Sequence, residues 1–124
     1  MQQRIAQIYK WLAWLMLAGL LVQLYLAGAP MFGATSFQPH RMLGFTLITL
    51  AIAFPILALV GRLGREQMRL SILILVLSFV QAGLPWLRSS IPWIAALHAV
   101  NAAVLIGISI QIGRSGRGPI LQAS

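Results

Sequence analysis

Two histidines are the side chains of this sequence best suited to chemistry. His40 and His98 are the only histidines among 124 residues, and a neutral imidazole is a good ligand for iron. His98 precedes Asn101 by three positions, which puts both side chains on one face of a helix. Two imidazoles on opposite sides of one iron hold a heme and fill both of its axial positions. The sequence therefore predicts a heme b site with His40 and His98 as the iron ligands.

Four further polar residues are candidates for contacting this cofactor. Arg41 and Arg88 are suited to the carboxylates of a heme, because arginine pairs with a carboxylate in a planar fork. Gln81 and Asn101 are polar groups within apolar stretches, where polar side chains are costly and are functional candidates. Each residue also has a structural interpretation. His98 can form an interhelical hydrogen bond with Gln81 or Asn101, and both arginines can extend toward lipid headgroups.

The composition places these residues in a membrane protein. Apolar residues make up 60% of the chain and charged residues only 8%, which is too little charge to cover a water-facing surface. The absence of cysteine excludes disulfides and thiolate metal sites. The single acid, Glu66, argues against paired-carboxylate catalysis and against transport coupled to a membrane-embedded carboxylate.

Four apolar runs are long enough to cross a hydrocarbon core about 30 Å thick. They cover about 11–29, 42–60, 68–87 and 93–112. We therefore predict one all-α domain over 1–124, an integral membrane four-helix bundle with up-down-up-down topology. The first run is longer than the apolar region of a signal peptide, so we expect it to stay as a membrane helix. No internal repeat is evident.

The basic residues predict the orientation of the bundle. They lie at the ends of the apolar runs, which is typical of a membrane protein and does not indicate nucleic-acid binding. Seven of them fall on one side, namely Arg4, Lys10, Arg62, Arg65, Arg69, Arg114 and Arg117. Only Arg41 and Arg88 fall on the other side. Because cytoplasmic loops carry the excess of positive charge, both termini are expected in the cytoplasm, with a bacterial inner membrane as the expected location.

In this topology the polar residues of all four runs fall in the outer half of the membrane. They are Gln23, His40, Gln81, His98 and Asn101. One polar site near the outer face is therefore expected. His98 lies about six residues beyond the start of its run, or ~9 Å of helical rise, whereas His40 is at the start of its own. Both rings reach one iron only if these two helices are staggered or the second run begins deeper in the membrane.

Three short stretches resemble the heme A synthase family. Residues 39–44, Pro-His-Arg-Met-Leu-Gly, are similar to its His-Arg-x-x-Gly motif; residues 81–84 are similar to its Gln-x-x-Leu-Gly stretch, and residues 97–99 to its Leu-His segment. That family folds as two four-helix bundles in one chain, with paired histidines holding heme. The resemblance implies that this chain corresponds to one such bundle and that His40 and His98 are axial heme ligands.

The chain departs from that family at its catalytic positions. Ser36 stands where the catalytic half has a glutamate four residues before the first motif histidine, and the outer-loop cysteine pair is missing. The resemblance therefore implies heme binding without heme A synthesis. No catalytic residue is assigned, and heme-linked redox activity stays open.

The predicted function is that of a small b-type, cytochrome-like membrane protein. It would transfer electrons or hold heme near the outer face, with the bilayer and a redox partner or larger membrane complex around it. The alternative is a cofactor-free accessory subunit of a larger membrane complex, in which the histidines are structural.

Overall fold

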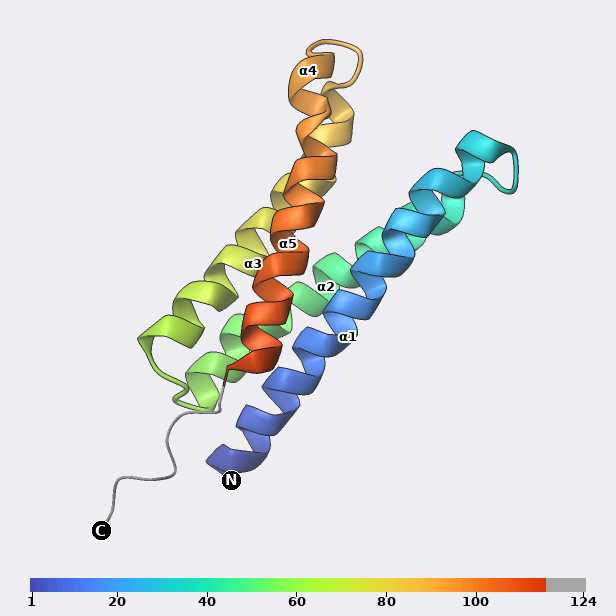
Figure 1. Ribbon diagram of the computed structural model, residues 1–124. Helices are drawn as coiled ribbons and strands as arrows, with labels where there is room; N and C mark the ends of the chain where they lie inside the picture. The colour runs from blue at the N-terminus through green and yellow to red at the C-terminus, as the bar shows by residue number, and fades with distance from the viewer. Residues whose placement is uncertain (116–124) are drawn as a thin grey trace.

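The apolar runs of the sequence form long helices, and their order is seen in Figure 1. The computed structural model describes residues 1–115, a range that excludes Arg117. Its elements are α1 (Gln2–Gly28), the 3-10 helix η1 (Ala29–Phe32), α2 (Gln38–Val60), α3 (Arg65–Gly83), the 3-10 helix η2 (Leu84–Leu87), α4 (Pro92–Ala95) and α5 (Leu97–Arg114). Every regular element of the described range is therefore helical, and the all-α prediction is confirmed.

Four helical segments within residues 1–115 are long and apolar enough to cross a membrane. They are Gln2–Phe32, Gln38–Val60, Arg65–Leu87 and Pro92–Arg114. Each contains one of the predicted runs and extends beyond it, because basic and polar residues at a helix end shorten the apolar run without ending the helix. Helices satisfy their own backbone hydrogen bonds, which a membrane interior requires.

The helices pack as a four-membered bundle in which α2 and α5 are diagonal neighbours. Both α1 and α3 pack along α2 and α5, whereas the backbones of α1 and α3, and those of α2 and α5, are not close neighbours. Figure 1 shows the N-terminus, the α2–α3 turn and the end of α5 together at one end, here called the closed end. The α1–α2 and α3–α4 connections lie at the other end, the open end, where the two helix pairs diverge.

The hairpin of α1 and α2 is repeated structurally by the hairpin of α3 and α5. Positions 58 residues apart correspond, and in six of these pairs both members are buried. The pairs are Ala13 and Ser71, Met16 and Ile74, Leu20 and Ser78, Leu47 and Leu105, Ala51 and Ser109, and Phe54 and Ile112. The same operation exchanges the α1–α5 and α2–α3 contacts. The repeat is one of burial and not of residue identity, so it is not evident in the sequence alone.

Tyr9 links corresponding positions of the two hairpins at the closed end. Its buried hydroxyl donates to the carbonyl oxygen of Gln67 at 3.0 Å and lies 2.7 Å from the hydroxyl of Ser71. Tyr9 and Gln67 are related by the repeat, so their contact marks an approximate twofold axis that runs along the bundle. The Tyr9 ring also packs edge-on against Phe54, with ring centroids 5.6 Å apart. Polar and aromatic contacts thus hold the closed end together.

Candidate functional site

The two histidines meet at the open end of the bundle, from helices on opposite sides of its axis. His40 is in the first turn of α2 and His98 in the first turn of α5. Their ring centroids are 6.0 Å apart, with an angle of 61° between the ring planes. The fourth membrane segment is divided into α4 and α5 at Ala96. Because α4 ends at Ala95 and α5 begins at Leu97, His98 also stands at a helix start.

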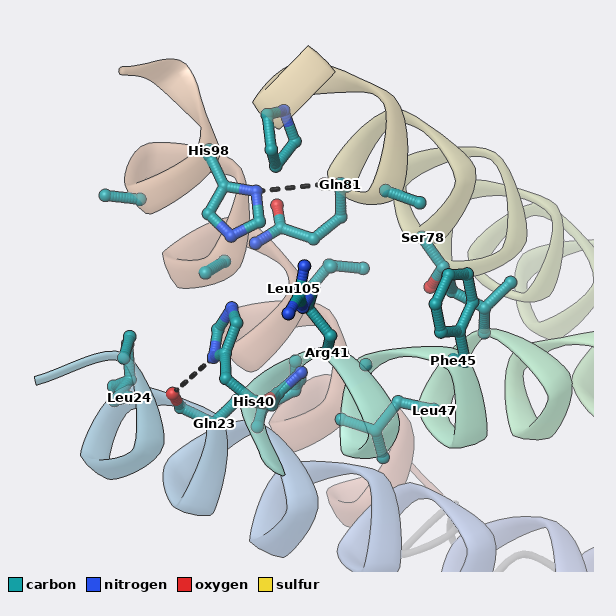
Figure 2. Close-up of a pocket in the computed structure, with 18 of the residues that line it drawn as sticks. Gln23, Leu24, His40, Arg41, Phe45, Leu47, Ser78, Gln81, His98 and Leu105 are labelled. Atoms are coloured by element: carbon teal, nitrogen blue, oxygen red, sulfur yellow. Dashed lines mark hydrogen bonds between the residues drawn. The ribbon is translucent and has the colours of Figure 1, made fainter. Parts of the chain in front are cut away.

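Each imidazole is oriented by one backbone carbonyl. The Nδ1 atom of His40 lies 3.2 Å from the carbonyl oxygen of Gln23, and that of His98 lies 2.9 Å from the carbonyl oxygen of Gln81. A carbonyl oxygen only accepts, so each Nδ1 donates and each Nε2 keeps its lone pair in the neutral ring. Figure 2 shows the two Nε2 atoms directed toward one another. Such a bond on the far nitrogen is the usual support of a metal-binding histidine.

The two histidine–carbonyl pairs correspond under the repeat. In each pair the glutamine precedes its histidine by 17 positions, and the offset of 58 relates His40 to His98 as it relates Tyr9 to Gln67. Each hairpin therefore contributes one imidazole in the same setting. The site between the rings lies on the approximate twofold axis.

A pocket of about 960 Å³ surrounds the two rings and is lined by residues of all four membrane segments. Five of the six predicted cofactor-contact residues line it: His40, Arg41, Gln81, Arg88 and His98. The other walls are mainly apolar, and both arginines are exposed. Figure 2 shows Arg41 reaching toward the pocket from α2. The volume is in the range of cofactor sites, which are about 300–1,000 Å³ and mostly apolar.

Asn101 does not line this pocket. In place of the predicted cofactor contact, its amide nitrogen donates to the carbonyl oxygen of Leu77 at 2.9 Å and to Oε1 of Gln81 at 2.7 Å. These bonds tie α5 to α3. Gln81 in turn has two roles, since its carbonyl orients His98 and its side chain is held by Asn101.

Gln23 is the residue of the first hairpin that corresponds to Gln81, and its side chain has no such partner. Its Oε1 is buried without a hydrogen bond to any atom in the described range 1–115. Gly44 makes room for it, because a Cβ at that position would lie 2.9 Å from Nε2 of Gln23. A buried acceptor without a donor is uncommon in proteins. The pocket wall beside His40 therefore retains unused hydrogen-bonding capacity.

Sequence reasoning identified Gln23 and Gln81 as polar residues of the site but missed how the rings are oriented and enclosed. The carbonyls of Gln23 and Gln81 are backbone groups, which a residue-type search does not detect, although the equal Gln-to-His spacing was a usable signal. Three aromatic residues, Phe37, Phe45 and Trp86, were also missed as lining residues. They are exposed side chains that look like ordinary lipid contacts in the sequence.

The donor set at the site contains only two protein ligands. Within residues 1–115, no cluster of three or more His, Cys, Asp or Glu side chains is placed to hold a metal ion. Structural zinc sites use four protein ligands and catalytic zinc sites use three.

A protein-family model matches part of the chain. The family described as "Family of unknown function (DUF6220)" matches residues 23–86, slightly more than half of the chain. The matched range includes His40, Arg41 and Gln81 and ends before Arg88 and His98. No curated protein and no solved structure matches the chain.

Proposed function

This chain belongs to the DUF6220 family of unknown function, and we propose that it is a membrane protein that binds one heme b between His40 and His98. The observation that carries the proposal is the pair of imidazoles on the bundle axis, each held by a carbonyl at Nδ1 and each directing Nε2 into a common pocket. Membrane-embedded histidines are functional candidates in their own right, because polar groups there are costly.

The ring separation fits a single iron between the two imidazoles. With metal–nitrogen bonds of about 2.0–2.1 Å, two imidazoles on opposite sides of one metal have centroids about 6 Å apart. The separation of the His40 and His98 centroids is 6.0 Å. The carbonyls of Gln23 and Gln81 fix the tautomer and raise the basicity of each ring. Both rings are therefore set in the state that a heme iron binds.

The remaining pocket residues fit the periphery of the same group. The apolar walls exclude water, and Arg41 and Arg88 provide guanidinium groups for two carboxylates at the open end. When bound, heme supplies one-electron redox chemistry. The residues of this chain hold it, orient its ligands and keep water from it. We assign the protein electron transfer or heme holding, with a redox partner or a larger membrane complex as its partner.

The resemblance of three motifs to heme A synthase supports the same assignment. His40 and His98 fall on the two motif histidines, whereas Ser36 replaces the glutamate of the catalytic half. Ser36 is exposed, and within residues 1–115 its hydroxyl oxygen accepts a hydrogen bond from the backbone N–H of Gln38 alone. Heme A synthesis is therefore not part of the proposed function.

We infer an up-down-up-down topology with both termini in the cytoplasm of a bacterial cell and the four helices in its inner membrane. The basic residues support this orientation, since Arg4, Lys10 and the arginines of the α2–α3 turn belong to the closed end, while Arg41 and Arg88 belong to the open end. The histidine pocket then opens toward the outer face.

The test is an absorption spectrum of the detergent-purified protein, first oxidised and then reduced with dithionite. Wild-type protein is expected to show a Soret band that shifts on reduction, with sharp α and β bands typical of six-coordinate, low-spin heme. His40→Ala and His98→Ala should each abolish this spectrum. Thr49→Ala should leave it unchanged, because Thr49 is exposed on α2 and bonds only to its own helix.

Two results would contradict heme binding at this site. One is a wild-type spectrum in both histidine variants. The other is colourless wild-type protein after expression with added hemin, which would favour the cofactor-free accessory subunit. Membrane localisation and far-UV circular dichroism of each variant establish that the bundle is intact.

A further inference from the structure

A second pocket lies on the outside of the bundle toward the closed end, between α3 and α5. It has a volume of about 580 Å³. Its residues are Arg65, Glu66, Arg69, Leu70, Leu73, Leu77, Val104, Ile108 and Gln111. The polar residues belong to the first turns of α3 and the last turns of α5, whereas the apolar residues continue toward the middle of both helices. The pocket is therefore a groove with a charged end and an apolar length.

The charged end carries a net positive charge. Arg65 and Arg69 are exposed and one helical turn apart on α3, so their guanidinium groups serve the same surface. Glu66 is the single acid beside them, and it leaves one positive charge in excess. Other cations of the same end, including Arg62 and Arg114, add to the positive field.

The apolar part of the groove has the length of a lipid acyl chain. From Arg65 to Leu77, α3 rises by about 18 Å, and Leu73 and Leu77 line the groove along this distance. Val104 and Ile108 of α5 form the opposite wall. In the membrane, a lipid in this groove would have its polar end at the headgroup level and its acyl chain in the hydrocarbon core.

The groove is a feature of the second hairpin alone. At the repeat-related positions of Arg65, Glu66 and Arg69, the first hairpin has Gln7, Ile8 and Trp11. At the position of Leu77 it has Gly19, and Leu47 packs so closely there that a Cβ on Gly19 would lie 2.5 Å from Leu47 Cδ2. The first hairpin thus closes this space by tight packing.

Because the two hairpins share six buried positions, the fold does not require the arginines of the groove. The first hairpin packs closely with Gln7, Ile8 and Trp11 at the positions of Arg65, Glu66 and Arg69. The combination of two arginines with an open apolar channel on the second hairpin therefore calls for a ligand with an anionic end and a long apolar tail.

We propose that this groove binds one anionic phospholipid. Arg65 and Arg69 hold the phosphate, and Leu73, Leu77, Val104 and Ile108 contact one acyl chain. Basic pockets between membrane helices on the cytoplasmic side are the usual sites for anionic headgroups, and arginine forms paired hydrogen bonds with phosphate. Lipid binding here is independent of heme binding at the open end, so the two can be tested separately.

The experiment is native mass spectrometry of the full chain, delipidated in detergent and titrated with dioleoyl phosphatidylglycerol. We expect one tightly bound lipid per chain and at least tenfold weaker binding of dioleoyl phosphatidylcholine. In the double variant Arg65→Gln/Arg69→Gln, phosphatidylglycerol should bind about thirtyfold more weakly, since each basic residue near the headgroups contributes about fivefold. The control Arg4→Gln/Lys10→Gln removes the same charge from α1 and should bind nearly as well as wild type.

A second pair of variants tests the groove without changing charge. Val104→Trp fills the apolar wall and should abolish the single tight site, whereas Thr46→Trp, at the repeat-related position of α2, should not. Both positions are exposed, so the fold should tolerate either change. If Arg65→Gln/Arg69→Gln and Arg4→Gln/Lys10→Gln lose the same affinity for phosphatidylglycerol, the attraction is diffuse and electrostatic, and the proposal is overturned. Tight binding by Val104→Trp, or equal affinity for phosphatidylcholine, would also overturn it.

Discussion

Gly44 provides the sharpest test of whether heme occupies the histidine pocket. It lines the pocket one helical turn beyond His40, and a Cβ there would lie 2.9 Å from Nε2 of Gln23. The Gln23 amide is the end of a flexible side chain, so Gly44→Ala needs only a small movement of that amide. Gly44→Leu adds atoms that extend into the pocket beside the ring of His40. We expect alanine to be tolerated and leucine to weaken heme binding.

The size of the effect follows from overpacking. Extra methylene groups in a filled site cost about 1–3 kcal/mol, which corresponds to about 5- to 150-fold in the dissociation constant for hemin. The free energy of unfolding of the apoprotein should increase, because replacing glycine within a helix gains about 0.5–1 kcal/mol of stability. Weaker heme binding together with undiminished apoprotein stability is therefore the expected signature.

Hemin titration followed at the Soret band gives the dissociation constant, and thermal unfolding followed by circular dichroism gives the stability. Gly107→Leu is the matched control, because Gly107 is on α5 and a Cβ added there would have no neighbouring atom within 4 Å. Wild-type affinity in Gly44→Leu would refute the placement of heme in this pocket, even if heme binds elsewhere. An equal loss in Gly107→Leu would show that the effect is indirect.

Two further substitutions separate structural from cofactor-contacting residues. Tyr9→Phe removes the hydroxyl that bonds to Gln67 and Ser71. Thermal unfolding should show a loss of stability of about 0.6–1.7 kcal/mol. The Soret band should stay unchanged. A shifted Soret band in this variant would contradict the separation of the two ends. Asn101→Leu removes the bond to Gln81 and should cost a similar amount of stability with heme retained. Loss of heme would instead make Asn101 part of the site.

The sequence was sufficient to predict the helices because a membrane interior allows few backbone structures other than a helix. An apolar run of about 20 residues must satisfy its backbone internally, and a helix does this without a partner. The ends of the helices were harder to predict. Arg4 and Lys10 lie within α1 although they end its apolar run, since charged side chains at a helix end reach the interface while the backbone stays helical.

The site was predictable as a set of residue types and less so as a geometry. The two histidines were identifiable because they are the only ones, and the structure brings them together with Arg41, Gln81 and Arg88 around one pocket. The break at Ala96, which brings His98 to a helix start, had no marker in the sequence. The rings are oriented by backbone carbonyls, which no residue type reveals in a sequence. Whether the Asn101 side chain bonds to Gln81 or faces the pocket depends on distances, which the sequence does not give.

The repeat limits what the histidine pocket can bind. The two imidazoles lie on either side of the approximate twofold axis and belong to corresponding positions. A ligand between them therefore meets an Nε2 lone pair of the same tautomer from both sides. A small asymmetric substrate would use one donor and leave the other buried without a partner. A planar macrocycle with a metal at its centre presents an equivalent face to each ring. The α3–α5 groove differs between the hairpins at the other end of the bundle, so it leaves the matched setting of the two imidazoles intact.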